Sequence, residues 1–349
     1  RQRQMCIRDR SIIQEEEKMM KTSKLFMTLP EAYACTPDGM EIDRYGNLIL
    51  SCPNYADEHM SGCVLRITKD RRVEKWFDVP VHPETGVARN MGIAFDGNWN
   101  IYLCDNQGWS ERPELLYKGR VLKCEVDDAG NIKKTTVIAD HMEHPNGIRI
   151  RGEYMYVTQS YLHPVKDPSG KLVSCVYRFR LDEHDIDITN TLEDPHILTT
   201  FITQNPETQY GADGIAFDSA GNLYVGNFGD GEVWKLVLNQ DGSLKEKSLF
   251  AKNPEELKST DGMVFDENGN LYIADFCANA IVKVTKDGYV SRLAQSPDCD
   301  GLDGGLDQPG EPIIYDGKIV ASCFDLVTGP GKVNTAHEMP ATLAEVDIS

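Results

Sequence analysis

The sequence predicts an all-β fold, a six-bladed β-propeller with four antiparallel strands in each blade. Three observations predict it: a repeated phrase, a regular succession of short strands and turns, and very little helical periodicity. The phrase is an Asp or Asn near Gly, an apolar strand, an Asp- and Gly-rich turn and a second apolar strand. Repeats of this kind, 42 to 67 residues apart, are too short to be domains and are typical of propeller blades. The copies start at positions 38, 90, 146, 213, 261 and 303.

The strands of one blade can be followed in the fourth copy. Residues 214–217 and 223–225 are apolar strands, and the turn between them, 218–222, contains Gly and Asn. Both residues tolerate positive φ and therefore suit a hairpin. Residues 232–236 and 248–250 predict the third and fourth strands, so one copy supplies a complete four-stranded blade.

The ring is expected to close through the two ends of the folded chain. Residues 24–26 read like the segments that precede the later copies. We therefore expect them to form the outer strand of the last blade, paired with 341–346, so that no sheet edge stays free. The unbroken repeat predicts one domain over 23–349. Residues 1–22 begin with a strongly charged run that breaks the pattern, and we interpret them as a non-native or disordered leader.

The composition of the chain excludes several classes of binding partner. The net charge is −19 over 349 residues, which disfavours phosphate backbones and anionic lipid surfaces and favours cations. No apolar stretch approaches the length that spans a bilayer. The ten cysteines contain no CxxC pair and are interpreted as free thiols of a reducing compartment. We therefore expect a cytoplasmic protein with no nucleic-acid partner, no membrane and no obligate protein partner.

The polar residues at the start of each copy form a candidate cation site. Each copy begins at the same end of the ring, so these side chains converge on the central channel. Carboxylates and carboxamides around one axis are the hard oxygen ligands that Ca²⁺ or Mg²⁺ binds. An Asp or Asn before Gly is also an ordinary turn residue, and Asp38 and Asp261 are expected to be structural in that sense. The set is Asp38, Asn90, Asn146, Asp213, Asp261 and either Asp303 or Glu311.

Other catalytic signals are weak. The sequence has no HExxH, no G-x-S-x-G and no phosphate-binding loop. His144 is close to the expected channel mouth and is a candidate substrate contact, although a hydrogen-bonded structural histidine is the more common case.

Two copies carry a resemblance to a known family. Asn146-Gly147-Ile148 and Asp213-Gly214-Ile215, each followed by a Tyr-containing apolar strand, are similar to the Asn-Gly and Asp-Gly blades of the family of senescence marker protein (regucalcin), gluconolactonase and drug-responsive lactonase. The resemblance covers residues 24 to 349. It implies a six-bladed propeller with a divalent metal on its axis, held by a Glu, an Asn and an Asp, and the hydrolysis of a lactone.

The resemblance also implies roles for single residues. Asn146 matches the family's Asn and Asp213 its Asp, and we expect Asp213 to be the catalytic base as well as a ligand. Asn90 matches the Asn of an Asn-Asp-Gly element and is expected to complete the metal shell or touch the substrate. Glu311 matches the Glu of a Glu-Gly-Pro element if the blade order is circularly shifted. Asp38 is the substitute if it is not.

Two departures limit the comparison. Met91 stands where the family has Asp, and Arg89 stands one place nearer to Asn90 than the family's sugar-contacting Arg, so specificity for aldonolactones does not transfer. The segment 104–118 is expected to give the substrate pocket a cover that differs from the one in the family. Side chains expected to close over the ring face are Trp109, Tyr161, Phe228 and Phe276.

The resemblance thus implies a metal-dependent lactonase that acts on a small lactone or ester. Ca²⁺ is the expected cofactor, with Mg²⁺, Mn²⁺ or Zn²⁺ as alternatives. The other hypothesis is a non-catalytic propeller whose Ca-plugged face binds a ligand or a protein, because a fold does not determine a function. The expected site comprises Asp213 as catalytic residue, Glu311, Asn146, Asp213 and Asn90 as metal ligands, and Asn90, His144, Trp109 and Tyr161 as substrate contacts.

Overall fold

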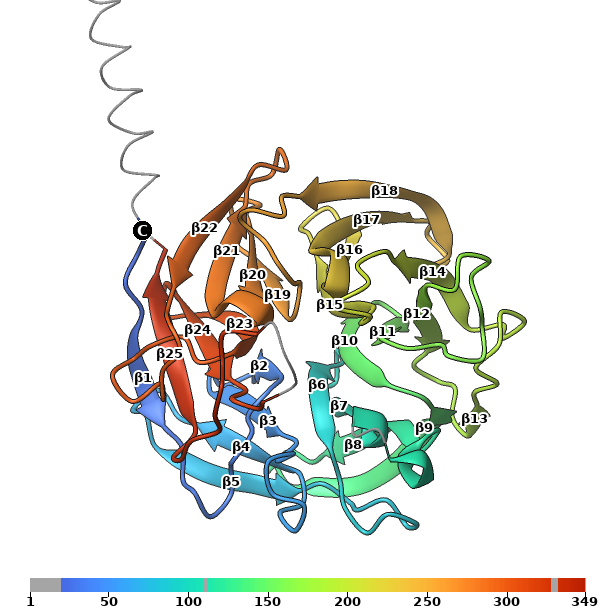
Figure 1. Cartoon of the computed structure of the whole chain (residues 1–349). Coiled ribbons are helices and arrows are strands. Elements are labelled where there is room, and N and C mark those ends of the chain that lie inside the picture. Colours follow the sequence, from blue (N-terminus) through green and yellow to red (C-terminus); the bar gives the residue numbers. More distant parts are fainter. Residues whose placement is uncertain (1–19, 110–111, 328–331, 349) are drawn as a thin grey trace, which may run out of the picture.

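Six antiparallel sheets stand around a central channel in the computed structural model, which describes residues 20–109, 112–327 and 332–348 (Figure 1). Each sheet is one blade, and in Figure 1 the strand at the channel is the first of its blade along the chain, except in the blade that joins the two ends of the chain, where the first strand is the outermost. The predicted all-β, six-bladed propeller is confirmed. Helical structure in the described residues is confined to four short 3-10 helices, η1 Gln107–Trp109, η2 Pro113–Leu115, η3 Phe228–Asp230 and η4 Phe276–Ala278.

The first three blades span residues 40 to 203. Blade one contains β2 Met40–Ile42, β3 Leu48–Cys52, β4 Cys63–Ile67 and β5 Val73–Asp78. Blade two contains β6 Asn90–Phe95, β7 Ile101–Asp105, β8 Gly119–Val126 and β9 Ile132–Met142, with β13 Ile186–Asp187 added in parallel at its outer edge. Blade three contains β10 Pro145–Arg151, β11 Tyr154–Gln159, β12 Leu172–Arg180 and β14 Ile197–Thr203.

The other three blades complete the ring. Blade four contains β15 Ala212–Phe217, β16 Leu223–Asn227, β17 Glu232–Leu238 and β18 Leu244–Lys252. Blade five contains β19 Met263–Phe265, β20 Leu271–Asp275, β21 Ala280–Val284 and β22 Val290–Gln295. Blade six contains β23 Pro309–Tyr315, β24 Lys318–Cys323, β25 Thr342–Asp347 and, from the other end of the chain, β1 Lys24–Thr28.

Blade six joins the two ends of the described chain. β1 pairs antiparallel with β25, with Lys24 opposite Glu345 and Thr28 opposite Thr342. This is the pairing that the sequence predicts. Just before it, the Lys21 backbone N–H donates to the Leu293 carbonyl at 2.7 Å, which ties the chain to β22. Residues 1–19 of the expected leader lie outside the described residues.

One turn design recurs after the inner strands. In blade four the Asp218 carboxylate accepts from the backbone N–H and the side-chain amide of Asn222 at 2.8 and 2.7 Å, and Gly221 adopts φ +85°. Blade two has the same bonds between Asp96 and Asn100, but Trp99 stands at the glycine position with φ +65°. A bulky residue in the left-handed region is strained. The same bonds occur at Asp43 with Asn47 and at Asp266 with Asn270.

The hydrophobic core lies between neighbouring blades. Tyr102 and Cys104 of blade two, for example, belong to one buried cluster with Tyr177 and Phe179 of blade three. Each blade therefore buries both faces of its sheet, which holds the inner strands close together at the channel. The cysteines among the described residues form no disulfide. No described helix has the length and apolar character that a membrane crossing requires.

Candidate metal centre

Glycines bring the inner strands into close contact around the channel. A Cβ atom added to Gly39 would lie 2.6 Å from the Met91 carbonyl oxygen, and one added to Gly147 would lie 2.8 Å from that of Asp213. Neither glycine has room for a side chain, because the backbone of the next blade occupies that space. This contact explains the glycine of the repeated phrase. The glycines packed in this way are Gly39, Gly92, Gly147, Gly214 and Gly262.

The residues that precede these glycines in four blades point to the channel axis, where they line a cavity of about 10 Å³ together with Glu311. A site needs roughly this volume to hold one water molecule, so the cavity has room for a single small ion. The structure thus brings together three of the predicted ligands, Asn146, Asp213 and Glu311. We call this group the hub, and its members are Asp38, Asn146, Asp213, Asp261 and Glu311.

The hub concentrates negative charge away from water. Burial and, after it, the charge of the neighbouring Glu311 raise the pKa of Asp38 to about 8. Burial, and to a lesser extent the charges of Asp38 and Glu311, raise the pKa of Asp213 well above its usual range. The pKa of Asp261 is also raised well above its usual range, mainly by burial. Carboxylates in such surroundings take up protons or bind a cation.

One cation of the protein contacts this charge. Arg149 donates from Nη2 to Glu311 Oε1 at 2.5 Å. The pair partly offsets desolvation, so burial raises the pKa of Glu311 only to about 6. The Asp213 carboxylate, in contrast, accepts no hydrogen bond from the described residues. Four carboxylates facing one guanidinium leave an excess of negative charge, and the donor set of the hub therefore fits a divalent cation with hard oxygen ligands.

The amide of Asn146 is oriented by a tyrosine. Asn146 Nδ2 donates to the Tyr210 hydroxyl at 3.0 Å, and that hydroxyl lies 2.6 Å from His144 Nε2. Burial lowers the pKa of His144 to about 3, so its imidazole is neutral and its Nε2 atom accepts a hydrogen bond from the Tyr210 hydroxyl. With Nδ2 bonded to Tyr210, the Asn146 Oδ1 atom is left for the hub cavity.

His144 and Tyr161 therefore lie behind the hub. The His144 ring centroid is 4.9 Å from that of Tyr161 and 5.3 Å from that of Tyr210. His144 contacts Tyr210 and supports it, and the expectation that His144 contacts a substrate stays a prediction. Tyr161 also stacks on His163, with centroids 4.9 Å apart. Trp109 ends η1, and its side chain lies outside the described part of the protein.

Asn90 is not at the hub. Its Nδ2 donates to Ser51 Oγ at 2.6 Å and to the Cys63 carbonyl at 3.0 Å, so the amide lies between blades one and two. Met91, not Asn90, precedes the packed glycine of this blade. Because side chains alternate along a strand, a shift of one residue turns Asn90 away from the axis. The structure therefore does not place Asn90 with the other predicted ligands, and its contact with a substrate stays a prediction.

Both carboxylates proposed for the ligand position reach the hub. Glu311 stands one place later than the other hub residues, at the position that glycine holds in the other blades, and its side chain lies against Gly262. Asp38 Oδ1 would lie 2.9 Å from a Cβ on Gly310, the residue at the matching position of blade six. The absence of a side chain at Gly310 thus leaves space for Asp38 and Glu311 together. Asp303 is exposed in the loop before β23.

Apolar side chains cover the end of the channel next to the hub. Phe228, Phe276 and Phe324 each follow a second strand and are no more than 5% exposed, with successive centroids 5.8 and 5.7 Å apart. Two of the three, Phe228 and Phe276, are residues that the sequence predicts over the ring face. We call the whole group the apolar arc, and its members are Tyr55, Met91, Tyr210, Phe228, Phe276 and Phe324.

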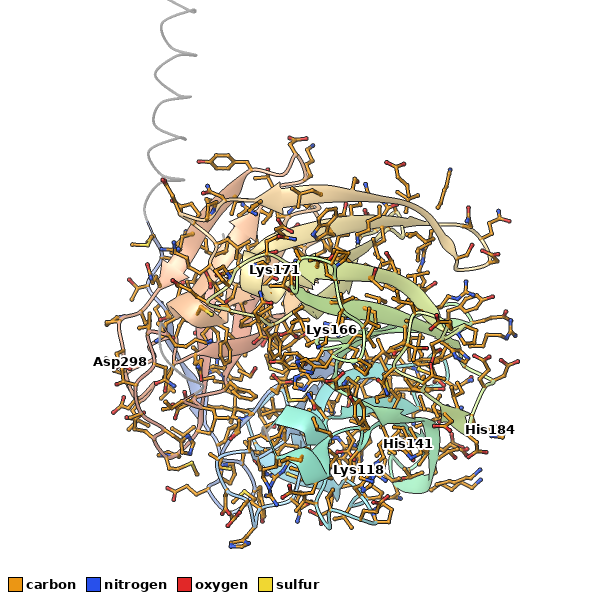
Figure 2. The ribbon with its side chains drawn as sticks, turned by 45° about the vertical axis from the view of Figure 1, so that its right-hand side comes forward. Lys118, His141, Lys166, Lys171, His184 and Asp298 are labelled. Atoms are coloured by element: carbon orange, nitrogen blue, oxygen red, sulfur yellow. The ribbon has the colours of Figure 1, made fainter. Side chains whose placement is uncertain are left out.

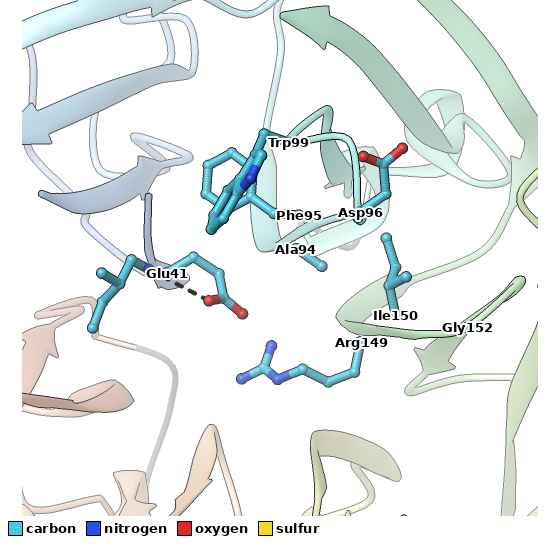
Figure 3. A pocket seen from close by; sticks show the side chains of 10 residues that line it. Glu41, Ala94, Phe95, Asp96, Trp99, Arg149, Ile150 and Gly152 are labelled. Carbon is cyan, nitrogen blue, oxygen red and sulfur yellow. Dashed lines mark hydrogen bonds between the residues drawn. The ribbon is translucent and has the colours of Figure 1, made fainter. Parts of the chain in front are cut away.

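The opposite end of the channel is open. It widens into a cavity of about 470 Å³ where the inner strands end, shown in Figure 3. Glu41 and Arg149 point toward one another in this cavity, and Trp99 stands at its wall. Arg149 also lines the hub, so its guanidinium lies between the two spaces. Burial raises the pKa of Glu41, while Arg149 lowers it.

Sequence reasoning missed Tyr210, Glu41 and Arg149. The last two could have been found, because each stands three residues after a hub residue, Asp38 or Asn146, in an otherwise apolar stretch. The strand register shifts just after the hub positions, between Pro145 and Ile148 for example. This irregularity breaks the simple alternation on which the sequence prediction relied.

Three solved structures share this architecture over nearly the whole chain. Luciferin-regenerating enzyme is 11% identical with a TM-score of 0.60, covering 94% of this chain and 95% of its own. Regucalcin from Agrobacterium tumefaciens is 11% identical with a TM-score of 0.58, covering 94% of each chain. A gluconolactonase from Xanthomonas campestris is 15% identical with a TM-score of 0.55, covering 95% and 96%.

The likeness establishes the fold. It includes regucalcin and gluconolactonase, the proteins to which the sequence motifs point, but also a streptogramin B lyase and an aldose sugar dehydrogenase with bound PQQ. The scan against protein-family models and the search of curated proteins gave no match. Function therefore has to be argued from the hub itself.

Proposed function

We propose that this protein is a divalent-cation-dependent hydrolase that opens a lactone or a related cyclic ester at the hub. One observation carries the proposal: four carboxylates, of which Asp38 and Asp213 are buried and the other two half-buried, converge with one oriented amide oxygen on a cavity of about 10 Å³. Gluconolactonases among the fold neighbours support the choice of reaction.

The residues proposed to hold the ion are Glu311, Asn146 and Asp213, with Asp38 and Asp261 adjacent. Ca²⁺ is the preferred candidate, because every donor is an oxygen and carboxylates predominate. Mg²⁺, Mn²⁺ and Zn²⁺ are alternatives. When bound, such an ion supplies Lewis acidity toward an ester carbonyl and stabilises the negative charge that develops on it.

Asp213 is proposed as the general base. Its carboxylate is buried at 3% exposure and accepts no hydrogen bond from the described residues, so both oxygens are available. Neutralising the excess charge of the hub lowers the pKa of Asp213, because repulsion from Asp38 and Glu311 is one cause of its raised value. The ionised carboxylate then orients a water molecule and accepts its proton.

The open end of the channel is the proposed route for the substrate. Aromatic side chains no more than 5% exposed cover the other end, whereas Arg149 lines both the hub and the 470 Å³ cavity. A ring of the size of a small lactone fits in that cavity. Trp99 supplies an apolar wall, and Glu41 and Arg149 supply hydrogen-bonding groups.

A second candidate function is a non-catalytic propeller that binds a ligand or a protein, with the ion as a structural plug. The small volume of the hub and the apolar arc above it favour this alternative, because a substrate has to displace Arg149 to reach Asp213. Both hypotheses expect a bound ion, and they differ in turnover.

The deciding experiment is a hydrolysis assay with the full chain. The protein is stripped with a chelator, reloaded with Ca²⁺, Mg²⁺, Mn²⁺ or Zn²⁺, and tested on a panel of lactones and esters. We expect turnover with at least one ion, and a fall in kcat of about 10²–10⁴-fold in Asp213→Asn, the range of a lost general base.

Asp287→Asn is the matched control, because it removes one carboxylate from an exposed turn of blade five. This variant should keep full activity. A reloaded protein that is no faster than the stripped protein on every substrate would favour the binding function.

A further inference from the structure

A second group of carboxylates lies in blade six, outside the hub. Asp307 precedes β23, Asp325 follows β24, and Glu338 lies in the connection to β25. One oxygen atom from each of them lies within 4.8 Å of the others. Two oxygens bound to the same Ca²⁺ at about 2.4 Å are at most about 4.8 Å apart. The spacing therefore suits one shared ion.

The place of this group can be found in Figure 2. Asp298, labelled at the left, accepts a hydrogen bond from the Thr335 backbone N–H at 3.2 Å, in the same connection that carries Glu338. The group thus belongs to the rim of blade six, on the side of the ring where the inner strand β23 begins.

Carboxylates alone do not make a cation site, and the unpartnered oxygens are the stronger observation. Asp307 is 1% exposed, and its buried Oδ1 accepts no hydrogen bond from the described residues. The same is true of Glu338 Oε2. Leaving a buried acceptor unpaired costs about 1–3 kcal/mol, more when it is charged.

An uncharged side chain adds an independent acceptor. Asn334 is 3% exposed and donates from Nδ2 to Asp325 Oδ1 at 3.0 Å. This bond holds its amide against the carboxylates, while its buried Oδ1 has no donor among the described residues. Three different side chains, Asp307, Asn334 and Glu338, therefore present an oxygen without a donor beside Asp325.

Nearby charges do not neutralise the group. His337 lies with Nδ1 3.2 Å from Asp325 Oδ2 and is the one basic side chain that the described residues bring within ion-pair distance of these carboxylates. Burial and, after it, the charges of neighbouring carboxylates, chiefly Asp325 and Glu338, raise the pKa of Asp307 to about 8. A cation or a proton has to compensate this charge.

We propose that Asp307, Asp325, Asn334 and Glu338 form a second divalent-cation site, separate from the hub and best suited to Ca²⁺. All four ligands are oxygens, and carboxylates predominate, which is the chemistry of Ca²⁺ sites. The proposal does not depend on hydrolase activity.

The site has a structural consequence for the channel. Phe324 and Leu326, the neighbours of Asp325 on either side, pack with the apolar arc. An ion shared by Asp307, Asp325 and Glu338 therefore links β23, β24 and the connection to β25, and it fixes the part of the arc that blade six contributes.

The test is a count of bound ions. The full-length protein is stripped, saturated with Ca²⁺, passed through gel filtration, and its calcium is measured by mass spectrometry. We expect two ions per chain in the wild type, one in the double variant Asp307→Asn/Glu338→Gln and one in the hub variant Asp213→Asn. Asp287→Asn, with an exposed charge removed, should keep two.

Two results would overturn the proposal. One is a folded double variant, by circular dichroism, that holds as many ions as the wild type. If the variant does not fold, wild-type crystals soaked in Mn²⁺ decide the question by anomalous scattering. A peak among the four side chains supports the site, and its absence in crystals whose hub is filled refutes it.

Discussion

The two ends of the channel differ in the side chains that surround the hub. At one end the apolar arc covers Asp213 and Asn146 with side chains of which Phe228, Phe276 and Phe324 are almost completely buried. At the other end the wall contains Glu41, Arg149 and Trp99 around about 470 Å³ of accessible space. The six inner strands thus line one channel with two different ends. We call the end under the apolar arc the dry end and the end at the 470 Å³ cavity the wet end.

The difference explains the electrostatics of the hub. Desolvation is the largest cause of the raised pKa of Asp38, Asp213 and Asp261. We expect the arc to contribute to that desolvation, while among the described residues that line the hub Arg149 is the one cation. The chemistry of the hub is therefore expected to respond to changes in the arc, and substrate binding to changes at the wet end.

The largest expected effect is a loss of stability of the metal-free protein as the pH rises. Asp38 and Glu311 have pKa values raised to about 8 and about 6, so the folded protein keeps protons that the unfolded chain releases near pH 4. The stabilisation that these protons give is complete below about pH 4 and is lost as the pH rises toward 8. The free energy of unfolding falls by about 1.4 kcal/mol per pH unit for each proton that the folded state binds and the unfolded state does not. Urea unfolding between pH 5 and pH 8 measures the decline.

Saturating Ca²⁺ is the control for that experiment, because a bound cation replaces the protons and should flatten the profile. A metal-free protein that is equally stable at pH 5 and pH 8 would contradict the assignment of a dry hub.

Phe276→Ala tests the arc directly. The truncation should cost about 3–5 kcal/mol of unfolding free energy, and water admitted to the hub should make the pH profile of the metal-free variant shallower. Phe179→Ala is the matched control, since Phe179 is buried between blades two and three. It should lose similar stability with an unchanged profile. Equal profiles for both variants would argue against the arc as the cause of desolvation.

Tyr210→Phe should weaken ion binding without emptying the arc. The variant keeps the ring but loses the hydroxyl that accepts from Asn146 and contacts His144. Losing a group that orients a ligand costs about 10–100-fold in metal affinity. Calorimetric titration with Ca²⁺ measures the change, and Tyr156→Phe, whose hydroxyl donates to the Gly242 carbonyl, is the control. Identical affinities in the two variants would exclude a positioning role for Tyr210.

Trp99→Gly has the smallest expected effect on stability and is the test of the wet end. Relief of the strained φ of +65° offsets the lost contact with Phe95, 5.6 Å away, so stability should change by no more than about 1 kcal/mol. If the substrate enters here, KM should rise several-fold with kcat unchanged. Tyr45→Ala, exposed in the matching turn of blade one, is the control. An unaltered KM would point to the other end.

Most of the fold followed from local patterns. The apolar strands of blade four and the turn after Phe217 agree with β15 to β18, because the hairpin bonds of Asp218 and Asn222 are local and leave a signature in the sequence. The pairing of β1 with β25 was predicted by similarity to the other outer strands. These features depend on neighbours in the chain or on a repeat, and both are visible without a structure.

The repeat predicted hub positions where it was regular, and Glu311 was predicted through the family resemblance instead. Asp213 and Asn146 precede the packed glycine and were placed at the axis, whereas Asn90 is one residue too early and bonds to Ser51 instead. Tyr210 was missed because its contact with Asn146 joins two blades, 64 residues apart in the sequence. Contacts of this kind depend on the rotation from blade to blade, which no local pattern records.

The pairing of β1 with β25 also bears on how the protein is made. Lys24 lies opposite Glu345, so blade six is assembled from β1, which is synthesised before the other strands of the propeller, and β25, which is synthesised after them. Until β25 has been synthesised, β1 has no partner strand and the sixth sheet has an unpaired edge, which favours association with other chains. Closure of the ring is thus expected to follow the synthesis of all the other strands of the propeller.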